Sequence, residues 1–172
     1  MRTQLRFSGS GGQGVITAAI IFAEAAVAQG FNAVQSQSYG PEARGGASKA
    51  EVIIDEEKIF HPHVKSPDFL LALTQKAADK YFHDLNPNGT LIIDSDLVPN
   101  PPYVPNIVSV PFTKIATEKL GKTLFTNIIA LGTVAKVSSF NLEAIKNAIF
   151  ERFPISSVES NFQALQLGFR SV

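Results

Sequence analysis

The chain has 172 residues, a formal net charge of zero and no cysteine, which suits a single domain that buries its own core. With no net charge, the chain has no overall positive field to attract a nucleic acid backbone. The missing cysteines exclude disulfides, thiolate zinc sites and cysteine-held iron–sulfur clusters within this chain. The N-terminus has no apolar signal-peptide core, and the longest apolar run is short and interrupted by Glu24. We therefore expect a cytoplasmic protein that binds neither nucleic acid nor membrane.

Strand and helix signals alternate along most of the chain. In chain order we predict a strand at 4–7, a helix at 15–29, strands at 31–38, 49–55 and 69–74, a helix at 75–85, strands at 90–94 and 107–112, and helices at 113–121, 124–139, 141–153 and 159–169. This order predicts an α/β fold: one three-layer domain over residues 1–172 with a mainly parallel, Rossmann-like sheet.

A glycine turn lies between the first predicted strand and the first helix. The sequence GSGGQG has the spacing Gly9-x-Gly11-x-x-Gly14, which is typical of a dinucleotide-binding turn. Such a site also needs an acidic residue about 20 positions later to hold a ribose hydroxyl. The corresponding stretch, AVQSQSYG, has none. Three interpretations remain open: a dinucleotide site in a free-standing protein, a turn needed only for strand–helix packing, or a site for another ligand or partner.

The second unusual loop is SYGPEARGGAS at residues 38–48, where glycine and proline exclude regular structure. Arg44 could clamp a phosphate or carboxylate with two hydrogen bonds. Glu42 could orient that arginine or form a salt bridge to another subunit. Alternatively, this is a surface loop whose charges pair with each other or with solvent.

Weaker candidates lie elsewhere in the chain. His61 and His63, two residues apart, could be half of a metal site or simply turn or interface residues. Asp94 and Asp96 could act as an acid–base pair, but they are better explained as caps of a strand end. The chain has thirteen phenylalanines, more than a small core needs, and some of them are expected to pack against partner chains. Those toward the C-terminus are Phe140, Phe150, Phe153, Phe162 and Phe169.

Taken together, the two loops resemble the gamma subunit of 2-oxoacid:ferredoxin (acceptor) oxidoreductases. The resemblance rests on GSGGQGVITAA followed by QSQSYGPEARGGASKAEVII, and it continues through FLLALT, GTLIIDSDLVP, VPFTKIATEKLG and TNIIALGTVAK. The sequence of the second loop most resembles that of the 2-oxoglutarate branch of this family. The pyruvate, branched-chain 2-oxoacid and indolepyruvate branches are near relatives.

This resemblance implies a subunit of an enzyme that decarboxylates a 2-oxoacid oxidatively on thiamine diphosphate and transfers the acyl group to coenzyme A (CoA). Electrons would leave through iron–sulfur clusters to ferredoxin, flavodoxin or another low-potential acceptor. This chain has neither cysteine nor a Gly-Asp-Gly thiamine motif. Thiamine diphosphate, Mg and the clusters are therefore expected in partner alpha and beta subunits, and in a delta subunit where one is present. This chain is expected to be inactive alone, with no catalytic residue and no metal.

We expect the two loops to lie together at the carboxyl ends of adjacent strands, the usual ligand edge of an α/β sheet. There they would face the thiamine-bearing subunits and shape the active-site entrance or a CoA site, with Arg44 as the anion-binding residue. The candidate residues are Gly9, Gly11, Gly12, Gln13, Gly14, Ser38, Tyr39, Gly40, Pro41, Glu42, Arg44, Gly45 and Gly46.

Overall fold

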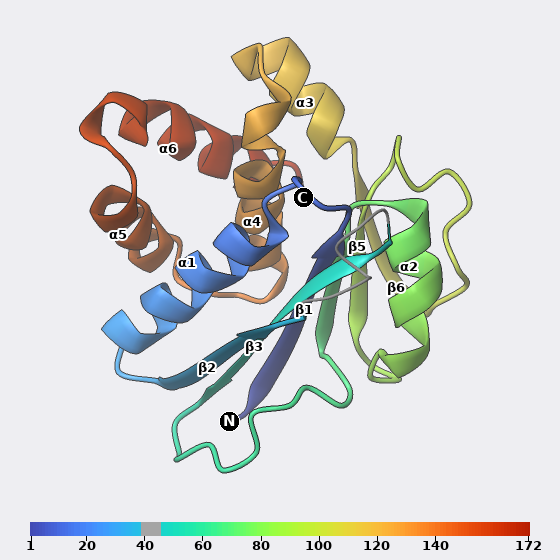
Figure 1. Ribbon diagram of the computed structural model, residues 1–172. Coiled ribbons are helices and arrows are strands. Elements are labelled where there is room, and N and C mark those ends of the chain that lie inside the picture. Colours follow the sequence, from blue (N-terminus) through green and yellow to red (C-terminus); the bar gives the residue numbers. More distant parts are fainter. Residues whose placement is uncertain (39–45) are drawn as a thin grey trace.

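A computed structural model describes residues 1–38 and 46–172 of the chain. The described residues form a six-stranded sheet of order β2-β3-β1-β4-β5-β6 (Figure 1). All of the predicted strands are present, with these bounds: β1 (Thr3–Gly9), β2 (Asn32–Gln37), β3 (Ser48–Asp55), β4 (Phe69–Ala72), β5 (Thr90–Asp94) and β6 (Asn106–Val110).

The sheet is mainly parallel, as predicted, but β3 is an exception. β1, β4, β5 and β6 pair in parallel, whereas β3 runs antiparallel to both of its neighbours, β1 and β2. The reason is the connection before β3. Residues 38–47 are too few for the helical crossover of about a dozen residues or more that parallel neighbours need, so β2 and β3 pair antiparallel.

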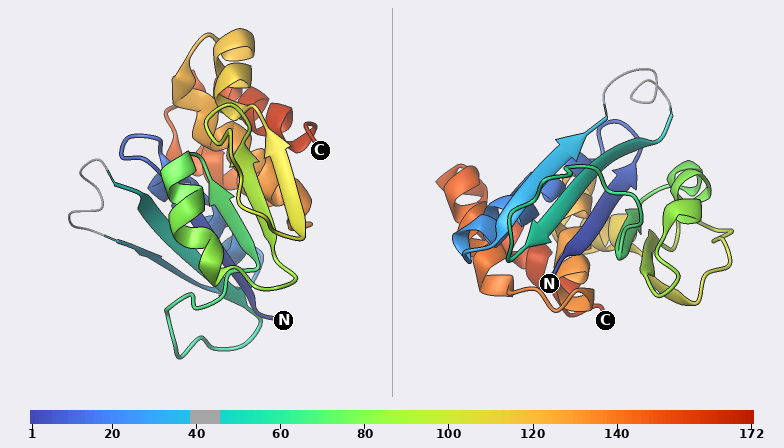
Figure 2. Two further views of the ribbon diagram at one scale, coloured as in Figure 1. Left: turned by 90° about the vertical axis from the view of Figure 1, so that its right-hand side faces the viewer. Right: turned by 90° about the horizontal axis from the view of Figure 1, so that it is seen from below.

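Helices cover both faces of the sheet, which confirms the three-layer prediction. One face carries α1, α4, α5 and α6, and the other carries α2 with the short helix η2 (Figures 1 and 2). The bounds are α1 (Val15–Ala28), α2 (Gln75–Tyr81), η2 (Phe82–Asp84), α3 (Phe112–Leu120), η3 (Thr123–Phe125), α4 (Thr126–Val137), α5 (Leu142–Arg152) and α6 (Ile155–Phe169). Across the described ranges, none of these helices has the length and apolar character to cross a membrane.

The main core lies between the sheet and the four-helix layer. Phe7 of β1 packs against Phe22 of α1 with ring centroids 6.1 Å apart, and Phe22 packs against Phe140 at 4.4 Å. Phe140, Phe153, Phe162 and Phe169 lie partly buried against this core. Their first role is therefore internal packing, whereas the side chain of Phe150 is 54% exposed.

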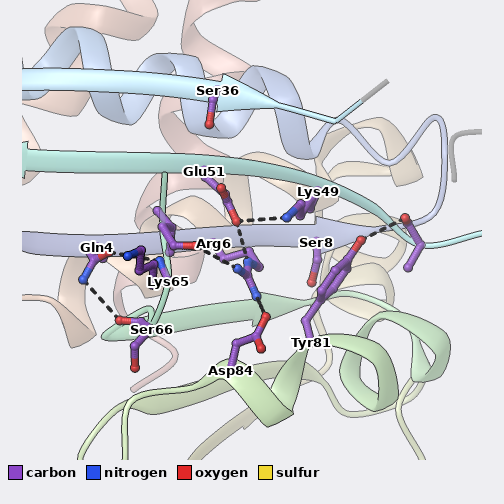
Figure 3. Close-up of polar contacts among 12 residues, drawn as sticks. Gln4, Arg6, Ser8, Ser36, Lys49, Glu51, Lys65, Ser66, Tyr81 and Asp84 are labelled. Atoms are coloured by element: carbon purple, nitrogen blue, oxygen red, sulfur yellow. Dashed lines mark hydrogen bonds and ion pairs between the residues drawn. The ribbon is translucent and has the colours of Figure 1, made fainter. Parts of the chain in front are cut away.

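Ion pairs of the buried Arg6 side chain join η2 to the sheet, on the face opposite the four-helix layer. Because side chains alternate along a strand, Arg6 faces away from the main core that Leu5 and Phe7 enter. Figure 3 shows its guanidinium between two carboxylates: Nε lies 2.8 Å from Glu51 Oε1 of β3, and Nη1 lies 2.7 Å from Asp84 Oδ2 of η2. Nearby, the Tyr81 hydroxyl donates to the Ala47 carbonyl at 3.1 Å. These bonds hold α2 and η2 onto β1 and β3.

Candidate functional site

The glycine turn leaves β1 at Gly9 and enters α1 after Gly14. The side chain of Gln13 folds back across it, so that Oε1 accepts the Ser10 N–H at 2.7 Å. A Cβ atom at Gly9 would lie 2.5 Å from the same oxygen, which explains the glycine there. Gly12 and Gly14 have φ values of 85° and 75°, in the left-handed region that side chains disfavour. The shape of the turn is therefore set by its glycines and by one glutamine.

Gly14 also allows α1 to approach α4 closely. Its carbonyl accepts a hydrogen bond from Asn127 Nδ2 at 3.1 Å, and a Cβ at Gly14 would collide with the Asn127 side chain. Gly14 thus serves helix–helix packing, whereas the packing interpretation from the sequence concerned the strand and the helix that the turn joins. The contact with Asn127 places the first turn of α4 beside the glycine turn, at the carboxyl end of β1 (Figure 1).

A cleft of about 700 Å³ opens at this junction. Its walls come from the glycine turn, from the segment leading into α4, from the first half of α6, and from Leu97 and Thr113, which follow β5 and β6. Within the described part of the chain, the lining residues are Gly12, Gln13, Gly14, Thr17, Leu97, Thr113, Lys122, Thr123, Leu124, Phe125, Thr126, Asn127, Ile128, Phe153, Ser156, Ser157, Ser160 and Asn161. A pocket of this size can take a large part of a cofactor-sized molecule.

The chemistry of the cleft favours an anion. Of its described lining residues, none is Asp or Glu, while Lys122 contributes an exposed ammonium group that forms no ion pair with the described residues. Serine and threonine hydroxyls add further donors. Three helices begin at its walls, α1, α4 and α6, and none of these starts has a side-chain cap at its N-cap residue. Uncapped helix starts add partial positive charge to that effect. Leu97, Leu124 and Phe153 supply an apolar surface beside these polar groups.

The structure separates the candidate residues into three groups. Gly12, Gln13 and Gly14 line the cleft, whereas Gly9, Gly11, Ser38 and Gly46 do not. Tyr39, Gly40, Pro41, Glu42, Arg44 and Gly45 lie outside the described residues.

The two strands whose carboxyl ends lead into the loops, β1 and β2, are not neighbours, contrary to our expectation. β3 lies between β1 and β2, because it pairs with both. The described base of the second loop nevertheless reaches the same edge of the sheet as the glycine turn. The Ser38 N–H donates to the Lys49 carbonyl at 3.2 Å, and Gly9 pairs with Ser48 at the start of β3.

Most of the cleft could not be predicted from the sequence. Lys122, Thr123, Thr126 and Asn127 lie more than 100 positions from the glycine turn, and the serines of α6 are further still. The available signal was a cluster of small polar residues at two helix starts. These residue types are so common at helix starts that the signal points to no ligand.

Asp94 is a structural cap, as the sequence analysis favoured. Its side chain is fully buried, and Oδ2 accepts bonds from the Thr113 N–H at 2.9 Å and the Thr113 hydroxyl at 2.7 Å. Oδ1 accepts from the N–H groups of Asp96 and Leu97. These bonds, all made inside the fold, hold the two cleft residues Leu97 and Thr113 in place.

The two histidines stand apart from the cleft. His61 and His63 are exposed in the connection between β3 and β4. Over residues 1–38 and 46–172, no group of three or more His, Cys, Asp or Glu side chains is gathered as a metal site requires.

The fold and the cleft define an α/β protein with an anion-favouring site outside the carboxyl ends of its strands, where this class of sheet binds ligands. Residues 4–171 match the pyruvate ferredoxin/flavodoxin oxidoreductase family, and the chain belongs to that family. It is similar to the 2-oxoglutarate synthase subunit KorC of Methanocaldococcus jannaschii, with 41% identity over 98% of this chain and 93% of that protein.

Solved structures show the same relationship. The gamma subunit of a keto/oxoacid ferredoxin oxidoreductase from Geobacter sulfurreducens superposes with a TM-score of 0.89 at 45% identity, covering 98% of this chain and 97% of that one. Pyruvate oxidoreductase subunit PORC from Thermotoga maritima gives 0.84 at 25% identity, with 99% and 96% coverage. The resemblance inferred from the two loops is thereby confirmed: this is a gamma-type subunit of a 2-oxoacid:ferredoxin oxidoreductase.

Proposed function

We propose that this chain is the gamma subunit of a complex that converts 2-oxoglutarate and CoA to succinyl-CoA and CO₂. The observation that carries the choice of 2-oxoacid is the near full-length similarity to KorC subunits, at 38–41% identity in four archaea. The ketoisovalerate, indolepyruvate and pyruvate subunits among the relatives are 28–30% identical. Initial rates of the purified complex with each 2-oxoacid test this choice, and faster turnover of another 2-oxoacid at equal concentration would overturn it.

The overall reaction balances with two electrons leaving the complex. The 2-oxoacid loses CO₂, its acyl carbon forms a thioester with the CoA sulfur, one proton is released, and two electrons pass to ferredoxin or another low-potential acceptor. Thiamine diphosphate with Mg would supply the decarboxylation chemistry, and iron–sulfur clusters the electron path. Both are assigned to the alpha, beta or delta partners, since this chain has neither a cysteine for a cluster nor a Gly-Asp-Gly thiamine motif. We assign binding rather than bond-making chemistry to the gamma chain.

The cleft is proposed to hold the phosphate-bearing part of CoA. That part of the molecule is polyanionic, and the cleft combines Lys122, several hydroxyls and uncapped helix starts with no carboxylate among its described lining residues. The apolar side chains at its edge suit the less polar arm of CoA, which would lead to the thiamine-bearing partner. Arg44, on the second loop, is proposed as a further anion-binding residue.

Lys122→Ala tests the cleft in the assembled complex. Loss of one charge-assisted contact is expected to raise the KM for CoA about tenfold, with little change in the KM for 2-oxoglutarate. Lys119→Ala is the matched control, because Lys119 is exposed on α3 and does not line the cleft. Arg44→Ala is measured in parallel. If CoA dependence, turnover and assembly are unchanged in both Lys122→Ala and Arg44→Ala, the proposed CoA role is wrong.

A free-standing dinucleotide-binding protein is the second candidate. It is disfavoured because β2 ends at Gln37, and the described residues there offer no carboxylate to bind a ribose. Titrating the purified chain with NAD(H) and FAD separates the two. Micromolar binding by the isolated chain would favour this second candidate.

A further inference from the structure

Two carboxamide side chains at the glycine turn have their orientation fixed by the backbone. Gln13 Oε1 accepts the Ser10 N–H at 2.7 Å. Asn127 Oδ1 accepts the Ile128 N–H at 2.9 Å, while its Nδ2 donates to the Gly14 carbonyl at 3.1 Å. A backbone N–H can only donate and a carbonyl can only accept. Neither amide can therefore turn over without losing its bonds.

This arrangement leaves amide donors for a ligand. The amide nitrogen of Gln13 has no hydrogen-bond partner within the described residues. In the described part of the chain, Ser38 Oγ is the single buried side-chain N or O atom without a hydrogen-bond partner. The unbonded Gln13 nitrogen is therefore not fully buried. Gln13 is one of the residues that line the cleft, and both protons of its amide are free of hydrogen bonds to the described residues. Asn127, 92% buried at the same wall, keeps one amide proton beyond the bond to Gly14.

Other lining residues add donors. Lys122 can only donate, and the hydroxyls of Thr17 and Ser160 make no side-chain hydrogen bond with the described residues, so they can rotate to donate. A fully ionised phosphate, which only accepts, can bind to such donors.

We infer that Gln13 is a specificity-determining residue of the cleft, which binds an ionised phosphate group through the amide nitrogen of a side chain whose oxygen is held by the turn. This inference rests on the proposed CoA site and assigns its phosphate contact to a residue. Gln13 then has two roles at once. Its oxygen closes the turn across Gly9, and its nitrogen contacts the ligand.

Gln13→Glu separates these two roles. The carboxylate keeps an oxygen for the Ser10 N–H, so the turn is preserved, but the amide donor becomes a negatively charged acceptor. In the assembled complex we expect the KM for CoA to rise by about tenfold to a hundredfold, with kcat and the KM for 2-oxoglutarate changed less than about twofold. Gln163→Glu, on the exposed side of α6, makes the same change of charge outside the cleft and should leave all three values unaltered.

Inorganic pyrophosphate identifies the part of CoA that Gln13 contacts. As a competitive inhibitor against CoA it carries only phosphate groups, so its inhibition constant should rise in Gln13→Glu by a factor similar to the KM. A KM for CoA or a pyrophosphate constant that stays at the wild-type value in Gln13→Glu would overturn the role of Gln13. If Lys122→Ala or Arg44→Ala still raises the KM for CoA in that case, the proposed CoA site survives. If neither does, the site itself is wrong.

Discussion

The buried side chain of Asp94 helps to fix the shape of the cleft wall. Asp94 does not line the cleft, yet its two oxygens accept four hydrogen bonds, and these hold Leu97 and Thr113 at the cleft wall. A buried carboxylate is tolerated when it is fully hydrogen-bonded in this way. The conformations of the segment after β5 and of the start of α3 therefore depend on Asp94.

Asp94→Asn should destabilise the fold although it changes only one atom. The new NH₂ group must face a pair of donors, so at least one bond is lost and a buried donor is left unpaired. We expect a cost of about 1–3 kcal/mol in the free energy of unfolding, measured by urea denaturation. Asp96→Asn is the matched control, because Asp96 is exposed and should change stability by less than about 0.5 kcal/mol. Equal stability of the two variants would contradict the capping role.

At the scale of elements, α4 and α6 approach more closely than side chains allow. A Cβ atom at Gly168 would collide with the Ile129 carbonyl, and one at Gly132 would collide with the Leu165 carbonyl. The Thr133 hydroxyl donates to the Gly168 carbonyl at 2.8 Å across the same contact. Because both helices also begin at the cleft, this contact sets the distance between two of its walls.

Gly168→Ala is expected to push α4 and α6 apart. The added methyl group meets backbone rather than a flexible side chain, so we expect a loss of about 1–3 kcal/mol in the free energy of unfolding. Thermal unfolding followed by circular dichroism measures it. Glu159→Ala provides the control, because it adds an alanine on the exposed side of the same helix. A melting temperature for Gly168→Ala as high as that of the control would show that the helices are not in tight contact.

At the scale of the whole molecule, large apolar side chains are exposed around the mouth of the cleft. Leu124, which lines it, is 75% exposed, and Ile155, next to the lining residue Ser156, is 85% exposed. A gamma chain whose cleft opens toward a thiamine-bearing partner would bury such side chains on assembly. Exposed apolar groups of this kind are typical of interfaces.

Leu124→Glu and Ile155→Glu should therefore weaken assembly without unfolding the chain. We expect the affinity for the partner subunits to fall about tenfold or more, measured by size-exclusion chromatography or mass photometry over a dilution series. Val27→Glu serves as the control, because Val27 is 57% exposed at the far end of α1 and outside the cleft. Unchanged assembly of both cleft-edge variants would exclude this surface as the interface.

Local patterns were sufficient to predict the strands and most helix positions. Continuous apolar runs such as FLLALT and the Asn141 cap before α5 depend on neighbours in sequence, and both predictions hold. The glycine turn was also visible, because its backbone conformation admits few residues besides glycine. Element ends were less exact. The predicted helix 159–169 begins at Ile155, directly after Pro154.

The antiparallel direction of β3 and the cleft itself depended on the tertiary structure. Strand direction follows from pairing partners and connection length, which apolar patterning does not encode. The cleft joins Gln13, Lys122 and Ser160, residues that are adjacent only because α1, α4 and α6 pack on one face of the sheet. The short-range signals in the chain thus identify the family and its glycine turn, whereas only long-range packing brings the polar groups of the cleft together beside that turn.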